Sequence, residues 1–262
     1  LEANFADAHH SFFISQYLAP LWSGASEWGL HFGERLFWWV HILGIFAFLN
    51  YLPYSKHFHI ILAFPNTYYA NLEAKGRFEN NATVTKEVAM MMDPTADPFA
   101  APAPDADAPV ERFGAKDAND LSWANLLNAY TCTECGRCTS ECPANLTGKK
   151  LSPRKIMMDT RDRIEEIGVN IAANGSFVDD GKSLLGDYIT NEELWACTSC
   201  NACVQACPVD IDPLNIIMKL RNFATMEESS APGALNAMMT NVENNGAPWP
   251  FNQMDRANWI NE

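Results

Sequence analysis

Basic residues are scarce in this chain of 262 residues. It has 18 lysine and arginine residues against 32 aspartate and glutamate residues, which gives a formal net charge of −14. Because the phosphates of a nucleic acid would repel such a surface, this balance excludes nucleic acid as a partner. No stretch joins a basic start, a short apolar run and a small-residue cleavage site, so we expect no cleaved secretory signal. The start at Leu1 rather than methionine suggests that a piece is missing in front of it.

Motifs that would carry catalysis are also missing. No Gly-x-Gly-x-x-Gly turn between a strand and a helix is visible, which argues against a flavin- or dinucleotide-binding fold. The eight cysteines all fall in two runs, Cys132 to Cys142 and Cys197 to Cys207, so no spare thiol remains for disulfide chemistry. We therefore expect any catalytic site to lie on another chain.

Both cysteine runs read C-x2-C-x2-C-x3-C-P, the bacterial ferredoxin pattern for cubane iron–sulfur clusters. Three closely spaced thiolates can hold three corners of one cube, and the fourth, followed by a proline that turns the chain away, reaches the other cube. The sequence therefore predicts two [4Fe–4S] clusters. The expected ligands are Cys132, Cys135, Cys138 and Cys207 for the first cluster, and Cys197, Cys200, Cys203 and Cys142 for the second.

Zinc and disulfides are the two alternatives for these cysteines. Zinc ribbons pair two C-x2-C knuckles across a gap rather than crowding four cysteines together. Disulfides need an oxidising compartment and a Cα geometry that a C-x2-C run rarely gives. The sequence favours cubane clusters over both, and cysteines committed to clusters agree with a reducing cytoplasm.

Residues 1–92 are predicted to form a membrane segment. From Leu36 to Leu52 the chain carries no formal charge, and aromatic residues flank this run as they do at membrane interfaces. We expect one transmembrane helix at about residues 34–64, followed by a connecting arm; a buried helix of a soluble domain is the alternative. Basic residues follow the run, so its C-terminal end should face the cytoplasm: Lys56, Lys75 and Arg77. The clusters would then lie on the cytoplasmic side of a bacterial cytoplasmic membrane.

His41 and His59 are candidate ligands of haem b. They are eighteen residues apart, so on one continuous helix they would share a face and lie about 27 Å apart. One imidazole near each leaflet is what two stacked b-type haems need, and histidines inside a span are usually functional. The alternative is that His59 lies in the interface and His41 bonds to a neighbouring helix. Pro53 lies between the two and can kink such a helix.

The stretch Leu52-Pro53-Tyr54-Ser55-Lys56-His57-Phe58-His59-Ile60 resembles the final membrane helix of the nitrate reductase gamma subunit and of the related cytochrome b subunit of membrane-bound heterodisulfide reductases. In that family a Pro-aromatic-Ser-basic segment precedes the second haem histidine. The resemblance implies that His41 and His59 are axial ligands. Because that family has about five spans and only one is evident here, the opposing ligands would come from a lost N-terminal portion or from another subunit.

Three further parts follow the membrane segment. Residues 93–120 are predicted to be an extended linker, because five prolines and four aspartates occur between Asp93 and Pro109. Residues 121–224 are predicted to be the dicluster domain. Residues 225–262 are expected to form an irregular tail, since they are rich in carboxylates, asparagines and prolines. The chain is thus predicted to be mainly α, a transmembrane helix segment followed by an all-α dicluster [4Fe–4S] ferredoxin domain.

The two halves of residues 121–224 form an internal repeat. Each cysteine run is followed by a capping residue and a proline that should begin a helix, at Ser152-Pro153 and Asp212-Pro213. Each of these helices carries an arginine eight residues after its proline, Arg161 and Arg221. A short helix over 121–130, with Asp120 as its N-cap, is expected before the first run. The insert between the halves should turn at Gly168, Asn174-Gly175 and Gly186.

The stretches Tyr130 to Cys138, Cys142 to Leu146 and Lys150 to Ile156 resemble the small iron–sulfur subunit of heterodisulfide reductase. In that family electrons pass to a catalytic subunit with cysteine-rich CCG domains. No Cys-Cys-Gly occurs in this chain. The resemblance therefore implies an electron-transfer role, with a CCG-domain or flavin-containing subunit as the partner.

The leading hypothesis is an electron-transfer subunit of a membrane respiratory complex, whose two clusters link haem b and quinone to a cytoplasmic dehydrogenase or reductase. The second is a subunit of a disulfide or 2-hydroxy-acid oxidoreductase whose catalytic site is on another chain. The third is a membrane-tethered cluster protein that binds a partner without turnover.

Overall fold

The computed structural model describes residues 15–22, 24–74, 76–93 and 112–260. These residues are mainly helical and form no β-strand apart from an isolated bridge between Leu185 and Ile189. The chain divides into two compact units, the second of which begins at His59. Most of the expected linker, residues 94–111, lies outside the described residues.

The first unit contains α2 (Ser15–Leu18), η1 (Ala19–Trp22), α3 (Glu27–Tyr51) and η2 (Leu52–Tyr54). Helix α3 begins at Ser26, whose Oγ accepts a hydrogen bond from the Gly29 N–H at 3.2 Å. No residue of α3 is buried, and its exposed side chains are almost all apolar. By length and composition alone, this helix could cross a membrane.

The expected single helix over 34–64 is wrong in one respect, because it is broken at residues 52–57. Pro53 lacks a backbone N–H and lies in the short turn η2, and Ser55 is extended, with φ −120° and ψ 163°. The Ser55 hydroxyl donates to the Leu52 carbonyl at 2.9 Å and stabilises the break. The chain becomes helical again in α4 (Phe58–Tyr68). His41 and His59 therefore lie on different helices, and the shared-face argument for haem loses its premise.

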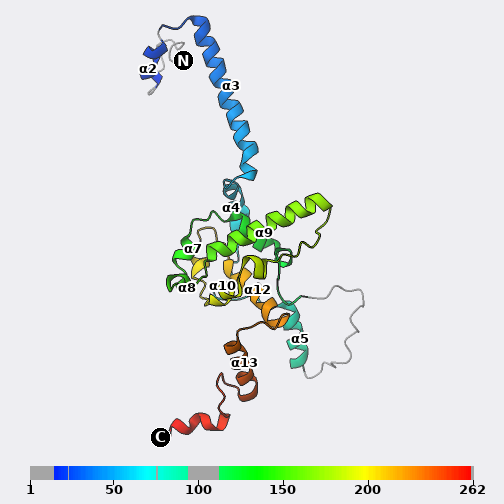
Figure 1. The fold of residues 1–262 in the computed structure, drawn as a ribbon. Helices are drawn as coiled ribbons and strands as arrows, with labels where there is room; N and C mark the ends of the chain where they lie inside the picture. The colour runs from blue at the N-terminus through cyan, green and yellow to red at the C-terminus, as the bar shows by residue number, and fades with distance from the viewer. Residues whose placement is uncertain (1–14, 23, 75, 94–111, 261–262) are drawn as a thin grey trace. The chain divides into compact units, whose positions relative to one another are not determined.

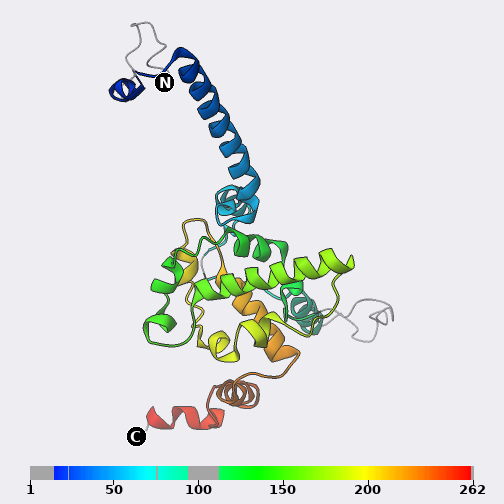
Figure 2. The ribbon, with the colours of Figure 1, turned by 45° about the horizontal axis from the view of Figure 1, so that its top comes forward.

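Helices α9 (Pro153–Asn174) and α12 (Pro213–Met226) form the centre of the second unit, where they cross in both views (Figure 1 and Figure 2). Their predicted N-caps are confirmed: the Ser152 hydroxyl accepts from the Lys155 N–H at 3.4 Å, and the Asp212 carboxylate accepts from the Asn215 N–H at 2.9 Å. The core side chains of both helices are at most 1% exposed: Ile156, Met157, Ile216, Ile217 and Leu220.

Shorter elements surround this pair in chain order: α5 (Ala82–Met92), η3 (Ala118–Asp120), α6 (Trp123–Thr131), α7 (Arg137–Ser140), α8 (Pro143–Leu146), η4 (Leu184–Tyr188), α10 (Asn191–Ala196) and α11 (Ala202–Gln205). Ser122, not Asp120, caps α6. Asp120 instead accepts the backbone N–H groups of Lys116 and Asp117 at 2.9 and 3.0 Å. Gly168 lies inside α9, which ends only at Gly175, where φ is 81°.

Residues 112–120 belong to this second unit rather than to a linker. Ala115 and Ala118 are at most 1% exposed, and the Ala115 N–H donates to the Lys219 carbonyl of α12 at 3.1 Å. A Cβ on Gly114 would lie 2.2 Å from the Phe223 nitrogen, so only glycine fits there. The linker predicted over 93–120 therefore ends before Arg112.

The irregular tail predicted over 225–262 is also wrong. It contains α13 (Gly233–Asn245) and the 3-10 helix η5 (Gln253–Ile260). Alanine, leucine and methionine are strong helix formers and dominate the middle of α13. Asn236 and Asn241 are accommodated inside the helix, and Gly246, with φ 62°, closes it.

Candidate metal centre

The two cysteine runs occupy equivalent places in the fold. In each half a helix ends at the first cysteine, a loop follows, and a four-residue helix carries the third cysteine. A long capped helix comes later, directly in the second half and after the additional short helix α8 in the first. Cys132 ends α6 and Cys197 ends α10, while α9 and α12 are the long helices. The predicted repeat thus has a structural counterpart.

Left-handed backbone conformations recur at matching positions of the two runs. Glu134 and Gly136 have φ of 60° and 83°, and their counterparts Ser199 and Asn201 have φ of 54° and 61°. L-residues rarely adopt this region, and such strain tends to occur at functional sites. Alternating conformations of this kind turn successive backbone N–H groups to one side, which suits an anionic group such as a thiolate-bound cluster.

The first expected ligand set lines a single cavity of about 80 Å³. Cys132, Cys135 and Cys138 come from the first run and Cys207 from the second, so the structure brings the four together across the repeat. Cys203 also borders this cavity. The rest of the wall is largely apolar: Met157, Pro208, Val209, Ile211 and Pro213.

The second set is brought together in a similar way. Burial raises the pKa of the Cys197 thiol, and the neighbouring thiols of Cys142 and Cys200 raise it further. Cys142 belongs to the first run, so this group of neighbouring thiols also draws on both halves. Cys142 and Cys203 are buried, whereas Cys135 and Cys200 are exposed.

The chemistry of the cysteines fits a group that supplies positive charge. Burial is the main factor that raises the pKa of Cys132, Cys138 and Cys197, and it raises the pKa of Cys203 to about 12. Such thiols ionise readily only when a bound metal stabilises the thiolate. A hydrogen-bond donor already faces one sulfur atom: the Ser199 N–H donates to Cys197 Sγ at 3.4 Å.

Zinc fits this arrangement less well. Among the residues that the structure describes, no three His, Cys, Asp or Glu side chains converge closely enough to hold a single metal ion. A zinc site needs four ligands around one ion, with sulfur about 2.3 Å from it. The first cysteine set lines a cavity instead, as a multi-atom cluster requires.

Arg161 and Arg221 each hold the first loop of a cysteine run. Arg161 Nη2 lies 2.9 Å from Glu134 Oε1. Arg221 Nη2 donates to the carbonyls of Cys197 and Leu194 at 2.6 and 2.8 Å, and Nη1 donates to the Ser199 hydroxyl at 3.2 Å. The sequence shows that both arginines repeat but not what they bind.

A buried arginine that sequence reasoning missed stabilises the same unit. Arg163 of α9 is completely buried and makes paired hydrogen bonds to Asp117 and to Asp180, at distances from 2.6 to 3.1 Å. These bonds attach residues 112–120 and the loop after α9 to that helix. In the sequence, the only signal for this buried contact is the presence of Asp117 and Asp180 in the segments before and after α9.

Helix α4 is attached to the second cysteine run. The Asn66 side chain is 2% exposed, and its Nδ2 donates to the Val209 carbonyl at 2.7 Å, two residues after Cys207. The ring of Tyr69, just after the helix, lies edge-on to that of Trp123 at 5.0 Å. His59, on the same helix, is half-buried, whereas His41 on α3 is exposed.

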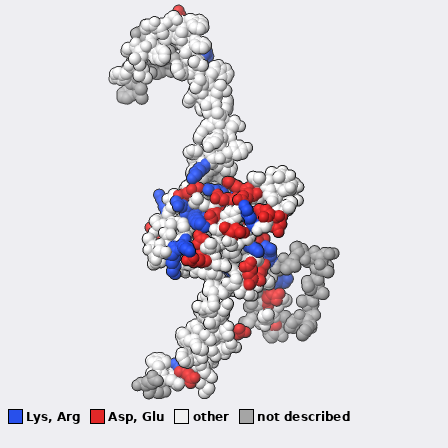
Figure 3. Space-filling model, viewed as in Figure 1, with Lys and Arg blue, Asp and Glu red and all other residues white. Residues whose placement is uncertain are grey.

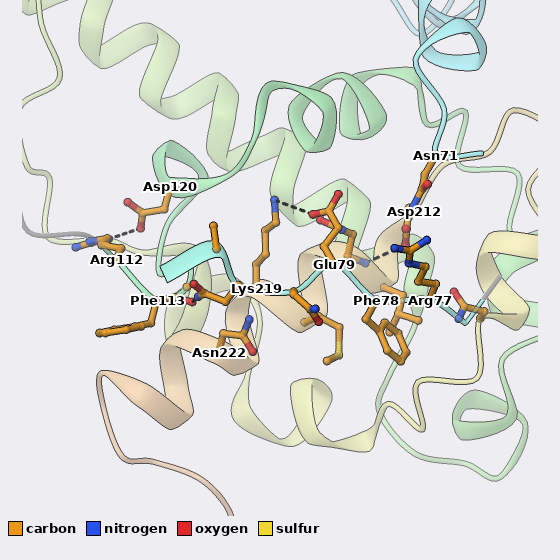
Figure 4. Close-up of a pocket in the computed structure, with 18 residues that line it drawn as sticks. Asn71, Arg77, Phe78, Glu79, Arg112, Phe113, Asp120, Asp212, Lys219 and Asn222 are labelled. Carbon is orange, nitrogen blue, oxygen red and sulfur yellow. Dashed lines mark hydrogen bonds and ion pairs between the residues drawn. The ribbon is translucent and has the colours of Figure 1, made fainter. Parts of the chain in front are cut away.

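A larger cavity of about 290 Å³ lies between residues 77–82 and α12 (Figure 4). Its basic side chains all have acidic partners. Arg112 pairs with Asp120, Arg77 pairs with Glu73 at 2.6 Å, and Lys219 lies 4.0 Å from Glu79. The cavity is therefore polar but offers no uncompensated charge from these residues.

Comparison with known proteins agrees with this geometry. Residues 131–211 match the family model described as "4Fe-4S dicluster domain". The chain carries a 4Fe-4S dicluster domain. This span includes all eight cysteines and both left-handed loops.

Curated relatives extend the similarity beyond the dicluster domain. The probable iron-sulfur-binding oxidoreductase FadF of Bacillus subtilis is 31% identical over 95% of this chain and 36% of its own length. The EtfAB:quinone oxidoreductase of Syntrophomonas wolfei is 29% identical over 87% of this chain and 31% of its own length. A subunit of the ferredoxin/F420H2-dependent CoB-CoM heterodisulfide reductase of Methanosarcina acetivorans is 34% identical over 42% of this chain and 54% of its own. The chain thus spans about a third of the length of the first two relatives.

Proposed function

We propose that this chain is the iron–sulfur electron-transfer subunit of a membrane-bound respiratory complex. In this proposal Cys132, Cys135, Cys138 and Cys207 hold one [4Fe–4S] cluster, and Cys197, Cys200, Cys203 and Cys142 hold the other. Bound clusters of this kind accept and release single electrons. The chain's own residues supply ligands, hydrogen bonds to sulfur and an apolar wall, and they make no covalent bond with a substrate.

The observation that supports the proposal is that cysteines from opposite halves of the repeat lie together. Cys207 lines the cavity of the first run. In the second run, the thiol of Cys142 helps to raise the pKa of the Cys197 thiol. This is the ligand pattern of two-cluster ferredoxins. Two clusters held side by side by one small unit suit a relay between a donor and an acceptor.

The ligand assignment can be tested with paired cysteine-to-serine variants of the reconstituted chain. If the fourth ligands are exchanged, Cys132→Ser with Cys207→Ser damages one cluster only and leaves about four of eight irons. Cys197→Ser with Cys207→Ser damages both. The opposite result assigns each run its own cluster, and zinc in anaerobically prepared protein would refute the proposal altogether.

The membrane part of the proposal is supported by α3, which has the length and the exposed apolar surface of a membrane span. We place the cluster unit on the cytoplasmic side of the bacterial cytoplasmic membrane, because Lys56 and Arg77 follow α3. Protease treatment of inverted and right-side-out vesicles tests this orientation. Cleavage of the cluster unit from the outer side would contradict it.

Haem b and quinone are the proposed partners in the membrane. Axial ligation by His41 and His59 now rests on the resemblance of residues 52–60 to a cytochrome b helix, since the two residues do not share a helix. Quinone is suggested by the relative named EtfAB:quinone oxidoreductase. Haem bands in the isolated complex that respond to a quinol, and that disappear in His41→Ala and His59→Ala, would support this part.

A second candidate places the same clusters in a disulfide or 2-hydroxy-acid oxidoreductase, with the catalytic site on a CCG-domain or flavin-containing chain. The similarity to a heterodisulfide reductase from Methanosarcina acetivorans favours it. The electron acceptor separates the two candidates. Cluster oxidation by quinone in membranes supports the first, and oxidation only by a disulfide in the presence of a co-purified subunit supports the second.

A further inference from the structure

The two halves of the repeat differ in charge around their cysteines. Arg137 precedes the third cysteine of the first run, where the second run has Ala202. Arg154 follows the first proline of α9, where α12 has Leu214. One half therefore carries two arginines at positions where the other, built on the same plan, carries none.

Both arginines lie at the edge of the first cavity. Arg137 and Arg154 line it together with Cys135, and all three residues are exposed. The two guanidinium groups come from different elements, α7 and the start of α9. They therefore flank the point at which the first cysteine set reaches the surface.

These two charges are not compensated within the part of the chain that the structure describes, where neither arginine has an ion pair. Two of the three nearby lysines differ: Lys150 pairs with Glu192 at 2.5 Å, and Lys155 pairs with Asp159 and Glu193 at 2.7 and 3.0 Å, whereas the exposed Lys149 has no ion pair among the described residues. The basic residues of the larger cavity are paired as well. Basic side chains are visible on the α7 and α8 side of this unit (Figure 3). In a chain with net charge −14, these two arginines give the edge of the first cavity a local positive charge.

We propose that Arg137 and Arg154 form a docking surface for an acidic electron-carrier protein, which binds over Cys135. The inference rests on the proposed electron-transfer function and names one partner class and its place of contact. Complementary charge at the rim of an interface guides the encounter and fixes the orientation. The contact brings the carrier to the exposed edge of the first cysteine set rather than the second. Binding itself forms and breaks no covalent bond and moves no proton.

Binding of a small acidic 2[4Fe–4S] ferredoxin to the full-length reconstituted chain in detergent tests the proposal. Both proteins are kept oxidised, so the dissociation constant is read without electron transfer, by biolayer interferometry at 0.1 M salt. We expect Arg137→Gln and Arg154→Gln each to weaken binding about two- to fivefold, as exposed ion pairs do. Arg154→Lys should retain the affinity, because the charge rather than the guanidinium shape is needed. Raising the salt to 0.5 M should weaken wild-type binding and remove the difference between wild type and the glutamine variants.

Lys86→Gln is the matched control. Lys86 is exposed on α5, has no ion pair among the described residues and lines neither cavity, and its loss changes the net charge by the same amount. Equal weakening in Lys86→Gln would overturn the proposal. The proposal would also be overturned if the glutamine variants bound the ferredoxin normally but lost binding to phosphatidylglycerol vesicles. That result would assign the two arginines to a lipid surface. Iron content and EPR signals of both clusters are recorded in parallel. If the clusters are present and the ferredoxin does not bind, the docking proposal alone fails; if the clusters are absent, the proposed function fails.

Discussion

Replacing Arg221 by lysine should destabilise the second half of the repeat more than the equivalent replacement of Arg161 destabilises the first. Arg221 uses its planar fork to hold the carbonyls of Leu194 and Cys197, and its guanidinium lies 5.0 Å from the centre of the Trp195 ring. A lysine ammonium cannot reproduce this fork. At least one carbonyl next to the second cysteine run then loses a charged hydrogen bond, each worth about 1.5–3 kcal/mol. With the lost ring contact, we expect a cost of about 2–4 kcal/mol.

Arg161→Lys is the matched comparison in the first half. Arg161 meets Glu134 through one nitrogen at 2.9 Å, and lysine can retain a single ion pair of this kind. We expect a cost of about 0–1 kcal/mol. The two substitutions make the same chemical change at equivalent positions, so the difference between them reports what each guanidinium holds.

Guanidinium chloride unfolding of the reconstituted chain, with iron release followed in the same samples, measures this difference. Arg221→Lys should lower the midpoint by about 0.5–1 M, given the usual slope for proteins of this size. About half of the iron should leave first, because the loop of Cys197 and Cys200 is the one that loosens. Equal midpoints for the two variants, or early iron loss only in Arg161→Lys, would refute this account of the arginines.

Three further predictions follow from the packing of the second unit. Arg163→Met should destabilise the chain by about 3–5 kcal/mol in denaturant unfolding, because it leaves Asp117 and Asp180 without their buried partner; Arg112→Met, which breaks only a half-exposed pair with Asp120, should cost less than about 1 kcal/mol. The hydrogen bonds from Arg163 lower the pKa of Asp180 from 3.8 to about 2. This pair therefore stabilises the fold fully above about pH 4 and loses its effect as the pH falls toward 2. In Asp180→Asn the dependence of unfolding on pH should become weaker over that range, and an unchanged acid unfolding profile would contradict the pairing. Gly114→Ala should lower the melting temperature by circular dichroism, at a cost of about 1–3 kcal/mol, because the added Cβ meets the backbone of Phe223 at 2.2 Å; a stable Gly114→Ala protein would show that residues 112–115 do not lie against α12.

Local signals in the sequence predict the repeat well. The pairs Ser152-Pro153 and Asp212-Pro213 combine a side-chain cap with a fixed φ, and such short-range chemistry begins a helix whatever surrounds it. Both caps are confirmed, as are the mainly helical fold and the dicluster domain.

The errors arise where the end of an element depends on its context. The asparagines and prolines after Thr225 suggest irregular chain, yet Asn236 and Asn241 lie within α13 and the prolines lie outside it. Pro53 by itself indicates a kink, but its combination with the extended Ser55 ends the helix outright. Neither outcome follows from periodicity alone.

The buried contacts could not be read from the sequence because they join distant segments. Arg163 looks like any exposed arginine of a polar helix until Asp117, 46 residues earlier, and Asp180, 17 residues later, are placed beside it. Arg161 and Arg221 also differ in what they bind: Arg161 meets a carboxylate side chain, whereas Arg221 meets backbone carbonyls. This difference too depends on the folded structure.

In the proposed ligand assignment, the first cysteine set takes Cys207 from the other half, and this has a consequence for how the protein is made. The ribosome must pass Cys138 and then add every residue up to Cys207 before the first cavity has its fourth thiol, which takes several seconds at about 5–20 residues per second. Throughout that interval the nascent chain exposes three thiols that cannot yet close around a cluster. Loading with iron and sulfide is therefore expected to wait until both halves have left the ribosome, and a chain truncated before Cys197 should emerge with neither site complete.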